Sequence, residues 1–293
     1  MTDMAAEREI TVGRIDYANI WPIFDRFEEC LAETGVRNVR VAKGVPATLN
    51  RALSEGTIDI AAISSFAYGQ RFDEYELLPE LSVSADGEVM SVLLFLKRPL
   101  EEALRGRIAV TTASATSVNL LRIVMQGRYG RCPELIAMEP DLEAMLERAD
   151  GALLIGDPAI RASWRPGPGI EVLDAARMWK EWTGLGMTFA VFAVRREAAR
   201  EAPETVRRVY EALAESKRRA LADIEGLSRK AAGRFGGGED YWERYFRTLR
   251  YGFGPQEQEG LSYYYDCAFR MGLLERRVAP ATWPDHAAAR VNE

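Results

Sequence analysis

Histidine is almost absent from this 293-residue sequence, because the only one, His286, stands in a polar C-terminal segment. A Ser/His/Asp triad, a Cys/His pair, a histidine-ligated metal and a histidine general base are therefore not expected. Cysteine is also scarce. Cys30, Cys132 and Cys267 are odd in number and far apart, which speaks against a disulfide framework and against a thiolate zinc site. We expect a protein without a metal centre, in a reducing cytosol.

Several other signals are missing. No run of about 18 apolar residues occurs, and the N-terminal MTDMAAERE lacks the apolar segment of a signal peptide, so we expect a cytoplasmic protein that does not enter a membrane. The formal net charge is −6 and no Lys/Arg block stands apart from Asp and Glu, which argues against a nucleic-acid partner. Neither GxxxxGK[ST] nor GxGxxG is found, so nucleotide cofactors have weak support.

What is present alternates between strand and helix. The pattern predicts a strand at residues 10–14, a helix at 24–33, a strand at 39–41, a helix between Pro46 and Gly56, and a buried strand at 58–63. Alternation with short connections favours parallel pairing and right-handed crossovers. The first part of the chain therefore predicts an α/β lobe.

A second lobe follows the extended segments at residues 76–97. Strands are expected at 108–112, 152–155 and 170–173, Asp141 is expected to cap a helix, and residues 188–194 carry the chain back. Helical patterns then cover 202–224, 241–249 and 255–271. We expect an α/β, two-lobed type II periplasmic-binding-protein-like fold with C-terminal helices. Its first lobe should comprise residues 1–97 plus 193–293, and its second lobe residues 98–192.

The stretch GRIDYANIWPIF, at residues 13–24, carries the first candidate for a functional side chain. Asn19 follows the first strand and precedes Pro22, where an extended strand must end. Ligands of open α/β sheets bind beyond the carboxyl ends of strands, which makes Asn19 a candidate catalytic residue. The alternative is an Asn that hydrogen-bonds the turn before the proline.

Hydroxyl and carboxylate side chains follow other strands. The segment after the strand at 108–112 is rich in Ser and Thr and precedes a helix. Hydroxyls beside the N-terminus of a helix are suited to bind a carboxylate or a phosphate. One or two of these residues can be explained as helix caps alone. Ser64 and Ser91 are expected to face the cleft or to be small core residues. Asp157 is expected at the carboxyl edge of the second lobe, as a ligand contact or a turn residue before Pro158. The hydroxyl candidates for substrate binding in the segment are Thr112, Ser114, Thr116 and Ser117.

The roles of two tryptophans can also be interpreted in two ways. Trp179 and Trp182 either close an aromatic wall over a planar ring or serve packing, as most tryptophans do.

The sequence resembles the chorismate dehydratases of the futalosine route to menaquinone along nearly its whole length. The segments that carry the resemblance are GRIDYANIWPIF, GVPATLNRALSEGTIDIAAISSFAY, SADGEVMSVLLF, IAVTTASATSVNLLRI, ALLIGDPAI and WKEWTGLGMTFAVFA. The resemblance implies the two-lobed fold and the removal of water from chorismate to give 3-[(1-carboxyvinyl)oxy]benzoate without a cofactor. It also implies that Asn19 lies next to the reacting ring, that the Ser/Thr segment binds a carboxylate, and that Ser91 and Asp157 lie in the same cleft. Trp21 departs from relatives, which commonly carry smaller side chains there.

Three other functions compete with this one. The first is a non-catalytic binding protein for a small aromatic carboxylate, and the second is the later pathway enzyme, 1,4-dihydroxy-6-naphthoate synthase. The third is an enzyme of this scaffold that acts on another cyclohexadiene acid, which the bulk of Trp21 suggests. The general base also stays open, between Asn19 and the substrate's own enolpyruvyl carboxylate. No oligomeric state is predicted.

Overall fold

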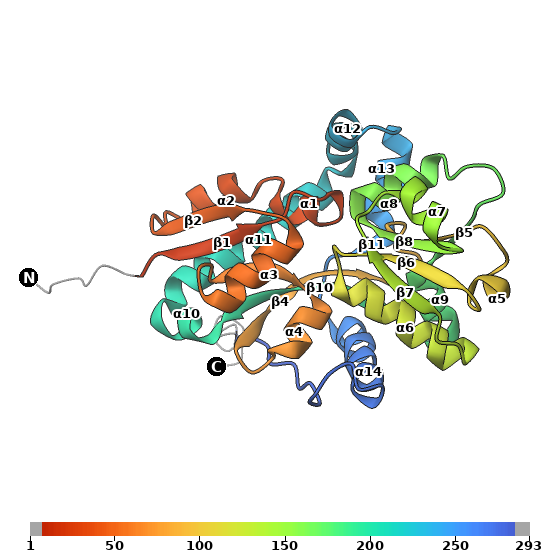
Figure 1. The fold of residues 1–293 in the computed structure, drawn as a ribbon. Coiled ribbons are helices and arrows are strands. Elements are labelled where there is room, and N and C mark those ends of the chain that lie inside the picture. Colours follow the sequence, from red (N-terminus) through yellow and green to blue (C-terminus); the bar gives the residue numbers. More distant parts are fainter. Residues whose placement is uncertain (1–7, 285–293) are drawn as a thin grey trace, which may run out of the picture.

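The computed structural model describes residues 8–284, and these form two lobes, each built on its own sheet (Figure 1). His286 lies outside the described residues. The first sheet has the order β11-β4-β10-β3-β1-β2 and the second the order β7-β6-β8-β5-β9. The two-lobed α/β fold expected from the alternation of strand and helix is confirmed.

Each sheet contains both parallel and antiparallel strand pairs, and the parallel pairs are those that the alternation of strand and helix predicted. In the first sheet, β1 pairs in parallel with β2 and β3, and β10 runs antiparallel between β3 and β4. In the second, β6 pairs in parallel with β7 and β8, and β5 runs antiparallel to β8 and β9. The strands of the first sheet are β1 (Ile10–Arg14), β2 (Val39–Lys43), β3 (Ile60–Ser64), β4 (Tyr75–Ala85), β10 (Met187–Arg195) and β11 (Leu249–Arg250). Those of the second are β5 (Val92–Leu96), β6 (Arg107–Thr111), β7 (Glu134–Met138), β8 (Gly151–Ile155) and β9 (Glu171–Asp174).

The chain changes sheets at residues 86–91 and 184–186, which differs from the expected boundaries at residues 97 and 192. Strand β5, expected in the first lobe, belongs to the second sheet, and β10, expected mostly in the second lobe, belongs to the first. Both strands are largely buried and apolar on both faces. A continuous apolar run predicts a strand but not the sheet that the strand joins.

Helices cover both sheets, and three further helices complete the C-terminal part of the described chain. In Figure 1, α12 and α13 lie on one side of the lobe junction and α14 on the other. The helices of the first lobe are η1 (Ala18–Ile20), α1 (Trp21–Phe24), α2 (Phe27–Glu33), α3 (Pro46–Glu55), α4 (Ser65–Gln70), α10 (Arg196–Glu201) and α11 (Pro203–Ala222). Those of the second are α5 (Leu100–Ala103), α6 (Ala115–Tyr129), α7 (Leu142–Arg148), α8 (Gly156–Trp164) and α9 (Ala175–Thr183). The remaining helices are α12 (Ile224–Phe235), α13 (Glu239–Thr248) and α14 (Pro255–Arg270).

A polar residue at the end of a strand repeatedly caps the helix that follows. Ser64 accepts the N–H of Ala67 at 3.4 Å, and Ser114 accepts that of Ser117 at 3.2 Å. Because the caps stand at the carboxyl ends of parallel strands, the N-termini of these helices meet at one edge of each sheet. Asp141 also caps α7, as predicted from the sequence, by accepting the N–H of Ala144 at 3.0 Å.

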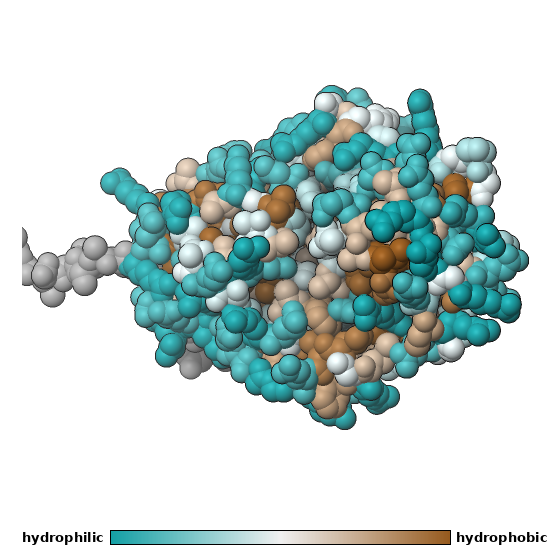
Figure 2. Space-filling view, in the orientation of Figure 1, coloured by the Kyte–Doolittle hydropathy of each residue, from teal (hydrophilic) through white to brown (hydrophobic). Residues whose placement is uncertain are grey.

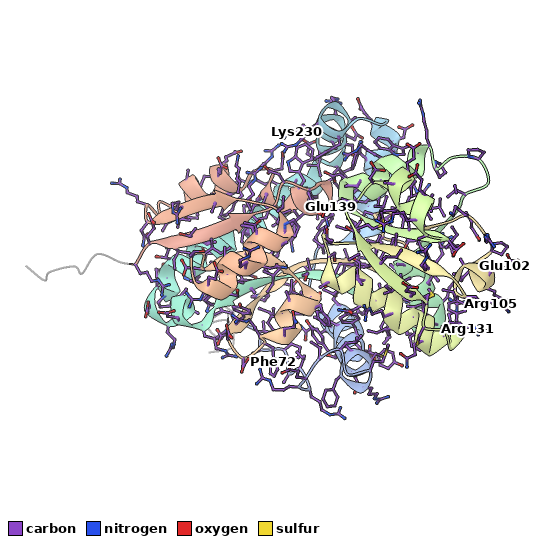
Figure 3. All side chains as sticks on the ribbon, viewed as in Figure 1. Phe72, Glu102, Arg105, Arg131, Glu139 and Lys230 are labelled. Carbon is purple, nitrogen blue, oxygen red and sulfur yellow. The ribbon has the colours of Figure 1, made fainter. Side chains whose placement is uncertain are left out.

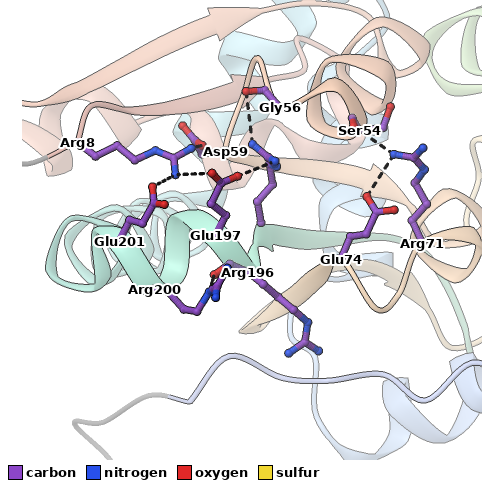
Figure 4. Close-up of polar contacts among 11 residues, drawn as sticks. Arg8, Ser54, Gly56, Asp59, Arg71, Glu74, Arg196, Glu197, Arg200 and Glu201 are labelled. Atoms are coloured by element: carbon purple, nitrogen blue, oxygen red, sulfur yellow. Dashed lines mark hydrogen bonds and ion pairs between the residues drawn. The ribbon is translucent and has the colours of Figure 1, made fainter.

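An ion-pair network closes the amino end of β1, at the opposite edge of the first sheet. Figure 4 shows Arg8 between Asp59 and Glu201. The buried Asp59 carboxylate also accepts the N–H of Thr11 at 2.9 Å. These charges tie the start of the chain to β3 and α10, and they take no part in the site described below.

The second crossing is packed tightly against α14. A Cβ atom placed on Gly260 would lie 2.2 Å from the carbonyl oxygen of Gly186, so only glycine permits this approach. The indole of Trp179 donates to the same carbonyl at 3.0 Å. The position of the second crossing therefore depends on the absence of a side chain at Gly260.

We expect Gly260→Ala to lower the free energy of unfolding by about 1–3 kcal/mol, because backbone must move to make room for the methyl group. Gly233→Ala is the matched control, since a Cβ there meets nothing within 4 Å in another helix. The control should raise the free energy of unfolding by about 0.5–1 kcal/mol. Urea unfolding of both variants measures this, and equal effects at the two positions would argue against a tight hinge.

Candidate active site

A pocket lies between the two lobes, at the carboxyl ends of β1, β3, β6 and β8. Its cavity volume is about 70 Å³, and about 640 Å³ when the open space of its mouth is counted, so in this conformation the lobes enclose only part of the space that a small organic molecule fills. Figure 2 shows hydrophobic residues gathered near the middle of this face, whereas its periphery is hydrophilic. The polar side chains of the lining are Tyr17, Asn19, Ser64, Ser91, Ser114 and Ser117. The rest of the lining is Ile15, Ile20, Pro46, Ile63, Val83, Val89, Val92, Ala113, Ile155, Gly156, Phe189 and Ala190.

A larger hollow on the first lobe contains more charge but is less suited to a ligand. Arg51, Arg71 and Arg276 line it. The guanidinium of Arg71 already pairs with Glu74, and that of Arg276 with Asp73. Its cationic groups are therefore largely neutralised within the protein.

Asn19 lies in the pocket with its amide free. It is the middle residue of η1, where the turn begins as the N–H of Ile20 bonds the carbonyl of Tyr17 at 3.3 Å. Its half-buried side chain makes no hydrogen bond to another described residue. The amide is thus available to a ligand, and the turn before Pro22 forms without it.

Asp157 holds that turn from the other lobe. It stands in the first turn of α8, and its buried carboxylate accepts the N–H of Ala18 at 3.1 Å. Burial raises the pKa of Asp157, against the opposing effects of the Ala18 N–H, Arg161 and Arg234. Asp157 does not line the pocket itself, so the structure places it beside the site as a contact between lobes.

The Ser/Thr segment divides into two groups. Ser114 and Ser117 line the pocket, and the Ser114 hydroxyl donates to that of Ser117 at 3.2 Å. Thr112 lies outside it, exposed, and donates to Glu139 at 3.1 Å. Figure 3 labels Glu139 on the side of the second lobe that faces the first.

Thr116 is wholly buried and joins the lobes. Its hydroxyl oxygen accepts the N–H of Phe66 at 2.9 Å, and its carbonyl accepts the Tyr264 hydroxyl at 3.2 Å. This residue is the second hydrogen-bonded link between lobes beside the pocket, and it is not in the lining.

Ser64 and Ser91 both reach the pocket. Ser64 combines this position with its role as the cap of α4. Ser91 ends the first crossing, is almost fully buried, and donates its hydroxyl to the carbonyl of Val89 at 3.2 Å. That carbonyl is the only partner of the hydroxyl among the described residues, and the distance is at the long end of the normal range. The backbone carbonyl of Ser91 accepts the N–H of Gly156 at 2.7 Å.

Asp174, which the sequence did not single out, fixes the crossing that bears Ser91. Its carboxylate accepts the N–H groups of Val89 and Met90 at 3.0 and 2.7 Å, and those of Ala176 and Arg177 at 2.9 and 3.1 Å. Met90 has φ of 58°, in the left-handed region that non-glycine residues rarely adopt. Burial raises the pKa of Asp174, although the four N–H groups oppose that rise. The strained turn is therefore held from the second lobe.

Tyr17, Phe189 and Gly156 are further lining residues that were not predicted. Gly156 has φ of 62°, and a Cβ there would lie 3.3 Å from the Tyr17 ring, so glycine permits the ring to lie against α8. Burial, and then the charge of Asp157, raise the pKa of Tyr17. The position of Tyr17 two residues before Asn19 was the available signal.

The tryptophans do not form the aromatic wall. Trp179 is buried at the second crossing and packs edge-on against Trp182, with ring centroids 5.9 Å apart. Trp21 faces α12, edge-on to Phe235 at 5.3 Å, with the Arg234 guanidinium over its ring. None of the three tryptophans lines the pocket. The bulk of Trp21 therefore does not limit the size of a ligand.

The electrostatic character of the pocket comes from helix ends. Within the described chain, no charged side chain lines it. The N-termini of α3, α6 and α8 are represented in the lining by Pro46, Ser114 and Gly156. Free N–H groups and the positive ends of helix dipoles favour anions, so the pocket suits a small carboxylate with an apolar ring.

Metal ligands do not gather in the part of the chain that the structure describes. No group of three His, Cys, Asp or Glu side chains among residues 8–284 is placed to hold a metal ion. Within the same residues, no helix is both long and apolar enough to span a membrane.

Comparison with known proteins identifies the family of the chain. A family model described as menaquinone biosynthesis matches residues 10–270. The chain belongs to this family. A chorismate dehydratase of Thermus thermophilus is 34% identical over 270 residues, which are 87% of this chain and 93% of that protein. A 1,4-dihydroxy-6-naphthoate synthase of the same organism is 30% identical over 185 residues, or 61% and 62% of the two chains.

Solved structures show how the fold of this menaquinone-biosynthesis family member is related to others. An alkanesulfonate-binding protein of Xanthomonas axonopodis pv. citri superposes with a TM-score of 0.71 at 18% identity, covering 94% of this chain and 97% of that one. The periplasmic-binding-protein-like fold expected from the sequence is thereby confirmed.

The link between lobes leads to a prediction about pH. The pKa of Asp157 in the folded protein is raised above its unfolded value of about 4, so its contribution to stability is present below about pH 4 and is lost as the pH rises through the folded pKa. Asp157→Asn keeps an oxygen acceptor for Ala18 and buries no charge. The free energy of unfolding of the wild type should therefore fall relative to that of Asp157→Asn between about pH 4 and about pH 7.

Asp157→Ala is the control, because it leaves the Ala18 N–H without an acceptor and should destabilise by about 1–3 kcal/mol. Urea unfolding at both pH values measures the three proteins. A difference between wild type and Asp157→Asn that does not change with pH would contradict this assignment.

Proposed function

We propose that this protein is a chorismate dehydratase, a hydro-lyase that converts chorismate to 3-[(1-carboxyvinyl)oxy]benzoate and water for menaquinone biosynthesis. The observation that carries the proposal is the free Asn19 amide in an uncharged pocket bounded by helix N-termini. Membership of the menaquinone-biosynthesis family and the long match to a chorismate dehydratase support it.

The reaction suits a site of this kind. The C4 hydroxyl leaves with the C3 proton, and the cyclohexadiene becomes a benzene ring. Aromatisation makes the step strongly downhill, so catalysis depends on alignment and exclusion of water more than on a strong base. The pocket between the two lobes, without histidine in its lining, provides groups that align the ring, and further closure of the lobes over the substrate would exclude water.

Five of the six polar side chains of the lining, all but Tyr17, then have a task. Ser114, Ser117 and the N-terminus of α6 bind one carboxylate of chorismate, since these donors lie together at a positive helix end. Asn19 orients the reacting ring beside C3, where the proton leaves. The acceptor of that proton is either Asn19 or the enolpyruvyl carboxylate of the substrate. Ser64 and Ser91 supply hydroxyls on the two remaining sides.

Thr112, Thr116 and Asp157 are proposed to act less directly. Thr116 and Asp157 keep the lobes together beside the substrate, and Thr112 lies at the rim with Glu139. We propose no metal and no cofactor for this reaction, and chorismate as the small-molecule partner. A cytoplasmic location and the absence of nucleic-acid and membrane partners stay predictions from the sequence.

The naphthoate synthase is the less favoured alternative. Its match covers 61% of this chain, against 87% for the dehydratase. A non-catalytic binding protein of the same fold stays distinguishable only by its lack of turnover.

Incubation of the purified protein with chorismate, followed by liquid chromatography and mass spectrometry, tests the proposed reaction. We expect chorismate to be consumed and a product lighter by one water to appear. Chorismate that stays intact, with saturable binding only, would identify a binding protein instead.

Asn19→Ala should lower kcat by at least about 100-fold, with a much smaller change in chorismate affinity, because the amide aligns the reacting ring. Asn119→Ala removes the same group from the solvent side of α6, outside the pocket, and should leave turnover unchanged. Steady-state kinetics and equilibrium binding separate the two effects. Turnover by Asn19→Ala at the rate of Asn119→Ala would remove Asn19 from the mechanism.

A further inference from the structure

Three tyrosine hydroxyls are buried in and next to α13 without a hydrogen bond in the described part of the chain. They belong to Tyr241, Tyr245 and Tyr251. A buried hydroxyl without a partner costs about 1–3 kcal/mol, and such groups in native proteins call for an explanation. For one of the three, the explanation lies in the pocket.

Tyr245 is fixed in place by other rings. It is completely buried on α13, stacked with Tyr241 at 6.3 Å and edge-on to Trp242 at 5.6 Å. Figure 1 shows α13 on the side of the second sheet that carries α8. Because its ring is held on both sides, the hydroxyl has little freedom to seek another partner.

The Ser91 side chain is close enough to the Tyr245 hydroxyl to influence its pKa, although the two hydroxyls do not have the geometry of a hydrogen bond. Burial raises the pKa of Tyr245 well above its usual range, and the neighbouring Ser91 side chain acts in the opposite direction. The phenol therefore keeps its proton at neutral pH and is available as a donor. Ser91 in turn is a lining residue whose own proton points to the carbonyl of Val89 over a long 3.2 Å bond.

We propose that Tyr245 is a positioning residue that acts through Ser91. When a substrate oxygen occupies the pocket, the Ser91 hydroxyl turns from Val89 to donate to that oxygen, and Tyr245 donates to the lone pair that Ser91 then presents. A hydroxyl that accepts one hydrogen bond donates a stronger one, so the pair polarises Ser91 toward the substrate. This proposal rests on the dehydratase function proposed above and adds a residue to its site.

The chain provides a close control in Tyr251. Its ring is also buried and its hydroxyl also lacks a partner among the described residues. Burial raises its pKa well above the usual range as well, with Tyr245 as the neighbour that adds to the rise and no contribution from Ser91. Tyr251→Phe thus removes the same atom from a similar buried environment that does not include Ser91.

The test compares Tyr245→Phe and Tyr251→Phe in stability and in chorismate turnover. Neither change removes a hydrogen bond present in the ligand-free protein, so both variants should unfold at urea concentrations equal to or above that of the wild type. Only Tyr245→Phe should lower kcat, by about tenfold, with KM changed less than about threefold, as expected for the loss of one hydrogen bond made in the transition state.

A double-mutant cycle shows whether the effect passes through Ser91. In the Ser91→Ala background, Tyr245→Phe should have no further effect on kcat, because the residue that it positions is gone. Equal rates for the two Phe variants, or a tenfold loss that persists in the Ser91→Ala background, would overturn the role of Tyr245. A wild-type protein that leaves chorismate intact would overturn the dehydratase function itself, and this outcome is distinct because every variant is then inert.

Discussion

The hydrogen bond from the Ala18 N–H to the Asp157 carboxylate connects the two lobes directly beside the pocket. Ala18 precedes Asn19 in a three-residue turn of the first lobe, and Asp157 belongs to a helix of the second. The bond from Phe66 to Thr116 repeats this link on the other side of the pocket. The turn that bears Asn19 is therefore held by a hydrogen bond from the second lobe as well as by one within the first.

The pocket offers an anion backbone and hydroxyl groups instead of charged side chains. The helix N-termini that meet at the pocket provide partial positive charge that is fixed before the substrate arrives. A guanidinium would bind a dicarboxylate more strongly, but it would stabilise the bound substrate and the transition state equally. Such binding does not accelerate the chemical step. Fixed dipoles and the scarcity of titratable groups suit an elimination whose driving force is aromatisation of the substrate.

The fold could be predicted from the sequence to a large extent, because alternating strand and helix patterns specify parallel pairing. The sheet changes were misplaced, since β5 and β10 are apolar on both faces and their pattern does not identify a partner strand. Asn19, Ser64, Ser114 and Ser117 could be placed at the pocket because each stands at or after the carboxyl end of a strand, and Ser91 because it lies in the segment that crosses between the lobes. Asp174 and Tyr245 could not, as their roles arise from contacts with segments more than 80 residues away, Met90 and Ser91. The sequence also could not show which way the Trp21 side chain points, because the ring that it contacts, Phe235, belongs to a helix far along the chain.

A crystal structure of the Asn19→Ala variant with chorismate tests the central claim most directly, because the slowed reaction preserves the substrate. The account predicts that chorismate lies between the lobes, with one carboxylate at Ser114 and Ser117 and its C3 atom facing residue 19. Chorismate bound instead in the hollow lined by Arg51, Arg71 and Arg276, with the pocket between the lobes empty, would contradict it.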